Sequence, residues 1–109
     1  MFGSKMSKVE KAIKTNNAHK LIELSGNNDT AICLAAIAGL GKVRDDSATN
    51  YLISRIQNVE PKIRIAIAQA LGTIGNVHTK AHLSAQMSKE TEPEVREAFS
   101  AAMSHIKDY

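Results

Sequence analysis

Two histidines, one cysteine and two arginines are the side chains whose types and spacing could support chemistry in this 109-residue chain. His78 and His82 are four residues apart, a spacing at which two imidazoles on one helix can share a metal ion. The sequence contains no HExxH pattern and supplies no obvious third ligand beside them. We therefore interpret both as surface or groove histidines, and we expect no metal or other cofactor.

The single cysteine, Cys33, cannot form an internal disulfide and lies in the most apolar segment of the chain. A nucleophilic thiol needs a nearby base and a polar pocket. The residues around Cys33 indicate neither, so we interpret it as a small core residue. We accordingly expect no catalytic residue and no enzymatic activity.

A row of lysines marks the beginning of the chain, where Lys5, Lys8, Lys11 and Lys14 recur every third residue. We interpret this row as the solvated side of a helix, and the alternative is an edge that binds an anion or a nucleic acid. The net charge of +3, from 14 basic and 11 acidic residues, falls short of a nucleic-acid-binding signature. We therefore expect no nucleic-acid partner.

No stretch of the sequence approaches 18 consecutive apolar residues, and no apolar run follows the first lysines. The first observation argues against a membrane span and the second against a secretory signal. The expected location is the cytoplasm.

Helical patterns must position all of these side chains, because apolar residues recur at separations of three and four along most of the chain. Asp29 or Thr30 is a suitable N-cap, and Pro61 and Pro93 suit the first turn of a helix. No convincing strand is found. The predicted helices cover residues 5–14, 17–25, 29–43, 47–58, 62–75, 77–89 and 94–107.

The helical patterns repeat along the chain. A shift of 31 residues places Leu40 and Gly41 on Leu71 and Gly72, and a shift of 32 places residues 61–64 on 93–96. Each unit has a nearly all-apolar first helix, a tight turn and a half-apolar second helix. A single domain over residues 1–109 is expected, with units of roughly 5–28, 29–60 and 61–92 and a terminal half-unit at 93–109.

The two best-matched segments, PKIRIAIAQALGTIGN and PEVREAFSAAMSHIKD, resemble HEAT-like repeats of the phycobilisome-lyase type. Such repeats run roughly as Pro-x-Val-Arg-x-x-Ala-x-x-Ala-Leu-Gly-x-Ile-Gly-Asp. The unit near Asp29 departs from this pattern, since Cys33 stands where Arg64 falls in the next unit. The resemblance implies an all-α fold, a right-handed α-solenoid of about seven helices stacked as antiparallel pairs.

In a stacked array, a first helix touches its own partner and both neighbouring units, so we expect the first helices to have little solvent-facing surface. Gly41, Gly72 and Gly75 fall where the first helices end, and we expect them to adopt the left-handed conformation there. The expected caps of the second helices are Asp45, Asp46, Ser47 and Asn76.

Arg64 and Arg96 occupy matched positions of the repeat. We predict that they pair with Glu60, Glu92 or carboxylates of the turns and tie adjacent units together. The alternative is that they line a surface for an acidic partner.

The resemblance implies a non-catalytic scaffold or protein–protein interaction module whose second helices line the concave side. The partner is expected to be another protein, and the chain a monomer or a weak homo-oligomer. The alternatives are an accessory subunit of a bilin-type lyase and a weak nucleic-acid or anion binder that uses the lysine row. The outward positions predicted to bind the partner are Lys20, Glu23, Asn50, Ser54, Arg55, His82, Gln86 and Lys89.

Overall fold

The computed structural model describes residues 4–58 and 60–107, and these residues form seven α-helices, a short 3-10 helix and no strand. Val59 and the last two residues of the predicted terminal half-unit lie outside the described residues. The elements in chain order are α1 (Ser4–Lys14), α2 (Ala18–Leu24), α3 (Thr30–Leu40), α4 (Asp46–Ser54), α5 (Pro61–Ile74), η1 (Val77–Thr79), α6 (Lys80–Met87) and α7 (Pro93–His105).

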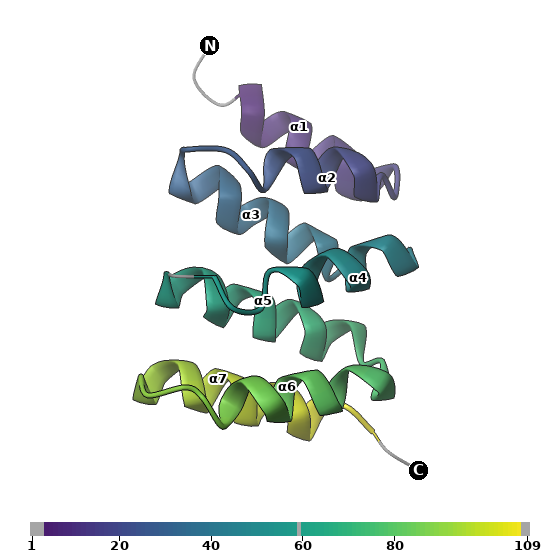
Figure 1. The fold of residues 1–109 in the computed structure, drawn as a ribbon. Helices are drawn as coiled ribbons and strands as arrows, with labels where there is room; N and C mark the ends of the chain where they lie inside the picture. The colour runs from purple at the N-terminus through teal and green to yellow at the C-terminus, as the bar shows by residue number, and fades with distance from the viewer. Residues whose placement is uncertain (1–3, 59, 108–109) are drawn as a thin grey trace.

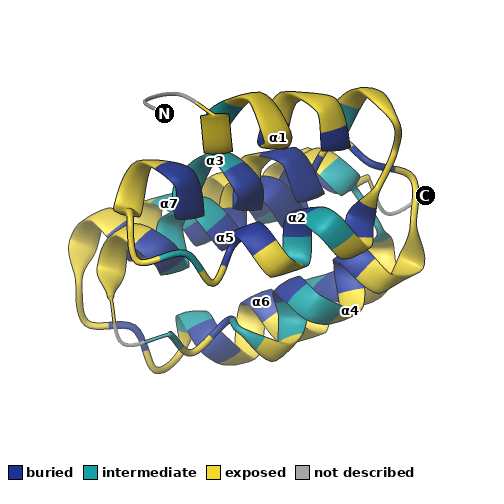
Figure 2. Cartoon of the chain, turned by 90° about the horizontal axis from the view of Figure 1, so that it is seen from above, coloured by how far each residue is buried: buried dark blue, intermediate teal, exposed yellow. Residues whose placement is uncertain are grey.

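The helices stack in two layers, as Figures 1 and 2 show. The first helices α1, α3, α5 and α7 pack side by side in one layer, and the second helices α2, α4 and α6 lie on one side of it. Each second helix also packs against the next first helix, so α2 contacts α3, α4 contacts α5 and α6 contacts α7. This arrangement confirms the predicted all-α solenoid of antiparallel helix pairs.

The core runs between the two layers as one continuous cluster. Leu40 and Leu71 are fully buried, and so are Leu52 and Leu83, the pairs that the repeat places in register. Phe99 fills the same core at the C-terminal end of the stack. The repeat therefore presents equivalent side chains to a shared interior, as neighbouring units of a solenoid require.

Side chains predicted as caps begin three of the helical segments. The carboxylate of Asp29 accepts a hydrogen bond from the backbone N–H of Ala31, and that of Asp45 accepts one from Ser47. The side chain of Asn76 does the same for His78 at the start of η1. These bonds satisfy amide groups that have no acceptor inside their own helix.

The prediction for the glycines is correct at Gly75 and wrong at Gly41 and Gly72. Gly75 ends α5 in the left-handed conformation, with φ of 72°. Gly41 has an ordinary φ of −70°, and Gly72 lies inside α5. A Cβ on either residue would lie 3.0 Å from a backbone Cα of the next first helix, that of Ala70 or Ala102. Both positions therefore need glycine because neighbouring first helices approach closely there.

The prediction that first helices have little solvent-facing surface is also wrong, because one side of α3 and one side of α5 are exposed. Ala31 and Ala38 of α3 are exposed, as are Gln69 and Thr73 of α5. The physical reason is the number of layers. Second helices cover one side of the first-helix layer, and among the described residues no third layer covers the other side.

Candidate interaction surfaces

The second helices present the predicted partner-binding positions, and most of these side chains are accessible. Glu23, Asn50, Ser54, His82 and Lys89 are exposed, whereas Lys20 and Arg55 are half-buried. We call the exposed side of α2, α4 and α6 the second-helix face. The helical spacing that buries Leu21, Leu52 and Leu83 turns the intervening polar residues away from the core.

Gln86 does not belong to this face, so the prediction that it points outward is wrong. Its residue is only 8% exposed, and its Nε2 donates a 3.1 Å hydrogen bond to Oε2 of Glu90. Its Oε1 has no hydrogen-bond partner among the described residues. Gln86 lies on the inner side of α6 because it follows the buried Leu83 by three residues, and residues three apart on a helix share one face.

Lys20 and Glu23 form an ion pair on α2, with 2.9 Å between the ammonium nitrogen and a carboxylate oxygen. The hydrogen bond from Lys20 lowers the pKa of the Glu23 carboxyl. Both side chains remain exposed to water, and pairs of this kind contribute little to stability. Lys20 and Glu23 can therefore exchange this pair for contacts with another molecule.

Arg55 is held by a hydrogen-bonded bridge that we call the N-terminal link. The hydroxyl groups of Ser25 and Tyr51 are 2.7 Å apart, and Nη1 of Arg55 donates to the Tyr51 hydroxyl oxygen at 2.7 Å. The guanidinium also lies 5.7 Å from the centre of the Tyr51 ring. The link joins the end of α2 to α4. Arg55 therefore stabilises the contact between these two helices, in addition to any contact that it makes with a partner.

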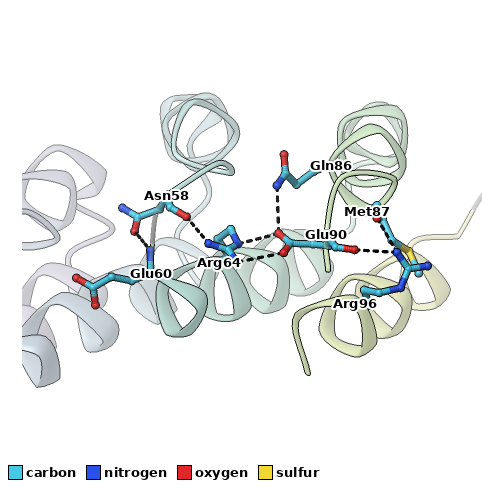
Figure 3. A network of polar contacts seen from close by, with 7 residues as sticks. All are labelled: Asn58, Glu60, Arg64, Gln86, Met87, Glu90 and Arg96. Carbon is cyan, nitrogen blue, oxygen red and sulfur yellow. Dashed lines mark hydrogen bonds and ion pairs between the residues drawn. The ribbon is translucent and has the colours of Figure 1, made fainter. Parts of the chain in front are cut away.

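Arg64 forms the centre of a second polar cluster, the C-terminal link, which Figure 3 shows with Glu90 between Arg64 and Gln86. Its Nε and Nη2 donate to the two carboxylate oxygens of Glu90 at 2.7 and 3.1 Å, and its Nη1 donates to the Asn58 carbonyl at 2.7 Å. The side chains of Arg64 and Glu90 are only 13% and 3% exposed. The prediction that Arg64 pairs with a turn carboxylate is confirmed, and the carboxylate is Glu90 of the same unit. The bond to the Asn58 carbonyl is the one that reaches the preceding unit.

Arg96 also binds a loop, through backbone carbonyls. Its Nη1 donates to the carbonyl oxygens of Met87 and Glu90 at 2.9 and 3.1 Å (Figure 3). Among the described residues no carboxylate pairs with Arg96. It satisfies carbonyl groups that α6 and its following loop leave free.

The side chains first considered for chemistry are scattered. His78 lies in η1 and His82 on α6, and both are exposed. Within residues 4–58 and 60–107, no three His, Cys, Asp or Glu side chains gather as a metal site would require. Cys33 is only 8% exposed, and burial raises the pKa of its thiol, which favours the unreactive protonated form.

The lysine row lies on α1, and Lys5, Lys8, Lys11 and Lys14 are all exposed. Two of them line a common hollow. Lys8 and Lys11 border a notch of about 250 Å³ between α1 and the start of α2, together with Lys20. Residues three apart on a helix are offset by about 60° at each step, so four of them spread over half of its circumference.

The largest hollow that we describe lies in the first-helix layer, away from the second-helix face. This α3–α5 groove has a volume of about 490 Å³, and its lining residues are Leu34, Ala38, Lys42, Lys62, Ile65, Ala66, Gln69, Ala70 and Thr73. The groove was not predicted from the sequence, because its alanines resemble those of a helix buried inside a stack. The polar residues Gln69 and Thr73, which interrupt the apolar sequence of α5, were the sequence feature that indicated an exposed side of this helix.

Comparison with known proteins supports the repeat. A family model described as HEAT repeats matches residues 18–104, most of the chain. No curated protein matches the sequence. None of the described helices is long and apolar enough to cross a membrane.

Proposed function

Because the chain belongs to the family of HEAT-repeat proteins, we propose that it is a non-catalytic interaction module that binds another protein through its second-helix face. HEAT-type curvature would make this face the concave one. No chemical step is assigned to any side chain, and the module would act by holding its partner.

One observation carries this proposal. Asn50 lies on α4, His82 on α6 and Lys89 two residues beyond the end of α6, and all three are exposed. None of the three side chains has a hydrogen bond or an ion pair with another described residue. Their polar groups are therefore available to a partner without breaking a contact that stabilises the fold.

The experiment compares capture by wild-type protein with capture by two charge-reversal variants. The immobilised chain is exposed to extract of its native host, and retained proteins are identified by mass spectrometry. His82→Glu combined with Lys89→Glu should lower recovery of the retained protein about tenfold, since the added negative charges change the electrostatic match to the partner. The matched control, Lys5→Glu with Lys14→Glu, reverses two exposed charges on α1, outside both the second-helix face and the α3–α5 groove, and should leave recovery unchanged.

Arg55 is avoided in this design because it belongs to the N-terminal link, and its loss would disturb folding. If the host extract yields no protein above the bare-matrix control, the proposed function is wrong. If the variant with Glu at positions 82 and 89 captures the partner as well as wild type does, the face is wrongly assigned.

A further inference from the structure

The α3–α5 groove has an apolar floor and lies on the open side of the first-helix layer. Leu34 and Ala38 of α3 face Ile65 and Ala66 of α5 across it. Ala38 is exposed, and the other three are half-buried. Their small or branched side chains leave a trough between two ridges, which is the shape that accepts a third helix.

Each end of the groove carries one basic side chain. Lys42 follows α3 and Lys62 is the second residue of α5, and both line the groove and are exposed. Because α3 and α5 run in the same direction, the two lysines lie at opposite ends (Figure 1). Their separation along the helix axes is roughly 16 Å, the rise of about eleven residues.

Neither ammonium group has an ion-pair partner among the residues that the structure describes. The groove therefore offers apolar contacts along its length and an unpaired positive charge at each end. A helix of about three turns would match its length.

We propose that the α3–α5 groove binds an amphipathic acidic helix of a partner protein. Such a helix would place apolar residues at positions i, i+3 or i+4, and i+7 on the groove floor. Its carboxylates, about eleven residues apart, would meet Lys42 and Lys62. This inference rests on the proposed role as an interaction module but assigns a different face from the one proposed above.

Charge decides between this occupant and a second copy of the chain. If two copies of the chain met through this face, Lys42 and Lys62 of one copy would lie near the same lysines of the other. Repulsion between these like charges would oppose the contact. An acidic amphipathic helix would form ion pairs with both lysines and would also cover the apolar floor of the groove.

The probe is a synthetic 15-residue peptide, acetylated and amidated, with Leu and Ala on one face and Glu eleven positions apart. Titrated into isotope-labelled protein, it should give saturable NMR shifts centred on the backbone amides of α3 and α5. The Lys42→Glu, Lys62→Glu double variant should bind about tenfold more weakly. A peptide with Lys in place of both Glu should bind this variant better than it binds wild type.

Ala38→Gln gives a second variant that obstructs the floor without changing charge. Ala38 is exposed, so the thermal midpoint should stay close to that of wild type while peptide binding weakens. Shifts centred on another face, equal peptide affinity of wild type and the double lysine variant, or no shifts at all would overturn the proposal. Concentration-dependent dimerisation that the peptide does not reverse would also overturn it, in favour of a second copy.

Failure of this inference can be distinguished from failure of the proposed function. If the peptide does not bind but the His82 and Lys89 substitutions abolish capture of a host protein, the groove inference is wrong and the proposed function stands. If the peptide binds and those substitutions have no effect, the second-helix face is wrong and the groove inference stands.

Discussion

The N-terminal and C-terminal links are two polar clusters that differ both in their chemistry and in what they join. In the N-terminal link, hydroxyl groups of Ser25 and Tyr51 share a hydrogen bond, and Arg55 adds a charged donor that remains partly hydrated. In the C-terminal link, Arg64 and Glu90 form an ion pair that is almost fully removed from water. The hydroxyl bridge therefore joins two units, whereas the ion pair lies within the unit 61–92 and Arg64 reaches the preceding unit through the Asn58 carbonyl.

A single position of the repeat explains part of this difference. Arg64 and Arg96 each donate to the carbonyl of the residue six positions earlier, Asn58 and Glu90. Cys33 occupies the corresponding place in α3 and cannot make such a bond. Loss of one member of the buried ion pair leaves the other charge unpaired, whereas Ser25 keeps a second hydrogen bond and Arg55 is in contact with water when the Tyr51 hydroxyl is lost.

The largest expected effect comes from Arg64→Met, which removes the guanidinium but keeps an unbranched side chain. Glu90 would then be a buried charge without its partner, and such a loss costs about 3–5 kcal/mol of unfolding free energy. Equilibrium denaturation in urea measures the change.

The control adds Glu90→Gln to Arg64→Met, which removes the buried charge while keeping an oxygen that can accept from Gln86. The double variant should recover much of the lost stability. A loss below about 1 kcal/mol in the single variant would mean that the pair behaves like one at the surface, and the contrast between the links would disappear.

An intermediate effect is expected from Gly41→Ala and Gly72→Ala, which test whether close helix packing is the same at both junctions. Each new Cβ would lie 3.0 Å from a backbone Cα of the neighbouring helix, so the helices must separate. Overpacking of this kind costs about 1–3 kcal/mol.

Gly72 lies within α5, where the higher helix propensity of alanine returns up to about 1 kcal/mol. The loss at Gly72 should therefore be the smaller of the two in thermal or urea denaturation. Unchanged stability of both variants would contradict close packing as the reason for glycine. Adding Ala70→Gly to Gly41→Ala provides the double-mutant cycle that isolates the contact.

The smallest effect is expected from Tyr51→Phe, which deletes the hydroxyl group shared by Ser25 and Arg55. Ser25 keeps a 2.6 Å hydrogen bond to the carbonyl of Ile22, and Arg55 is partly exposed to water. The cost should be about 1 kcal/mol, that of an ordinary hydrogen bond. A larger loss than that of Arg64→Met, measured under the same conditions, would reverse the ranking of the two links.

The repeated helices, three of their caps and the registered core could be predicted from the amino-acid sequence. The caps at Asp29, Asp45 and Asn76 depend on residues two positions away, and the burial of Leu52 and Leu83 follows from a period of about one unit. Local bonds and periodic patterns can be read along the chain because they involve short separations or simple repetition. Which face binds a partner stays a prediction.

The packing of the helices was needed to establish which carboxylate pairs with Arg64, which side of α6 carries Gln86, and that Gly41 and Gly72 lie at close helix contacts. It also left one side of the first-helix layer open as the α3–α5 groove. These features depend on the rotation of each helix about its axis and on the distance between units. Packing against neighbours sets both quantities, and a hydrophobic period of three to four residues leaves them free over tens of degrees and several ångströms.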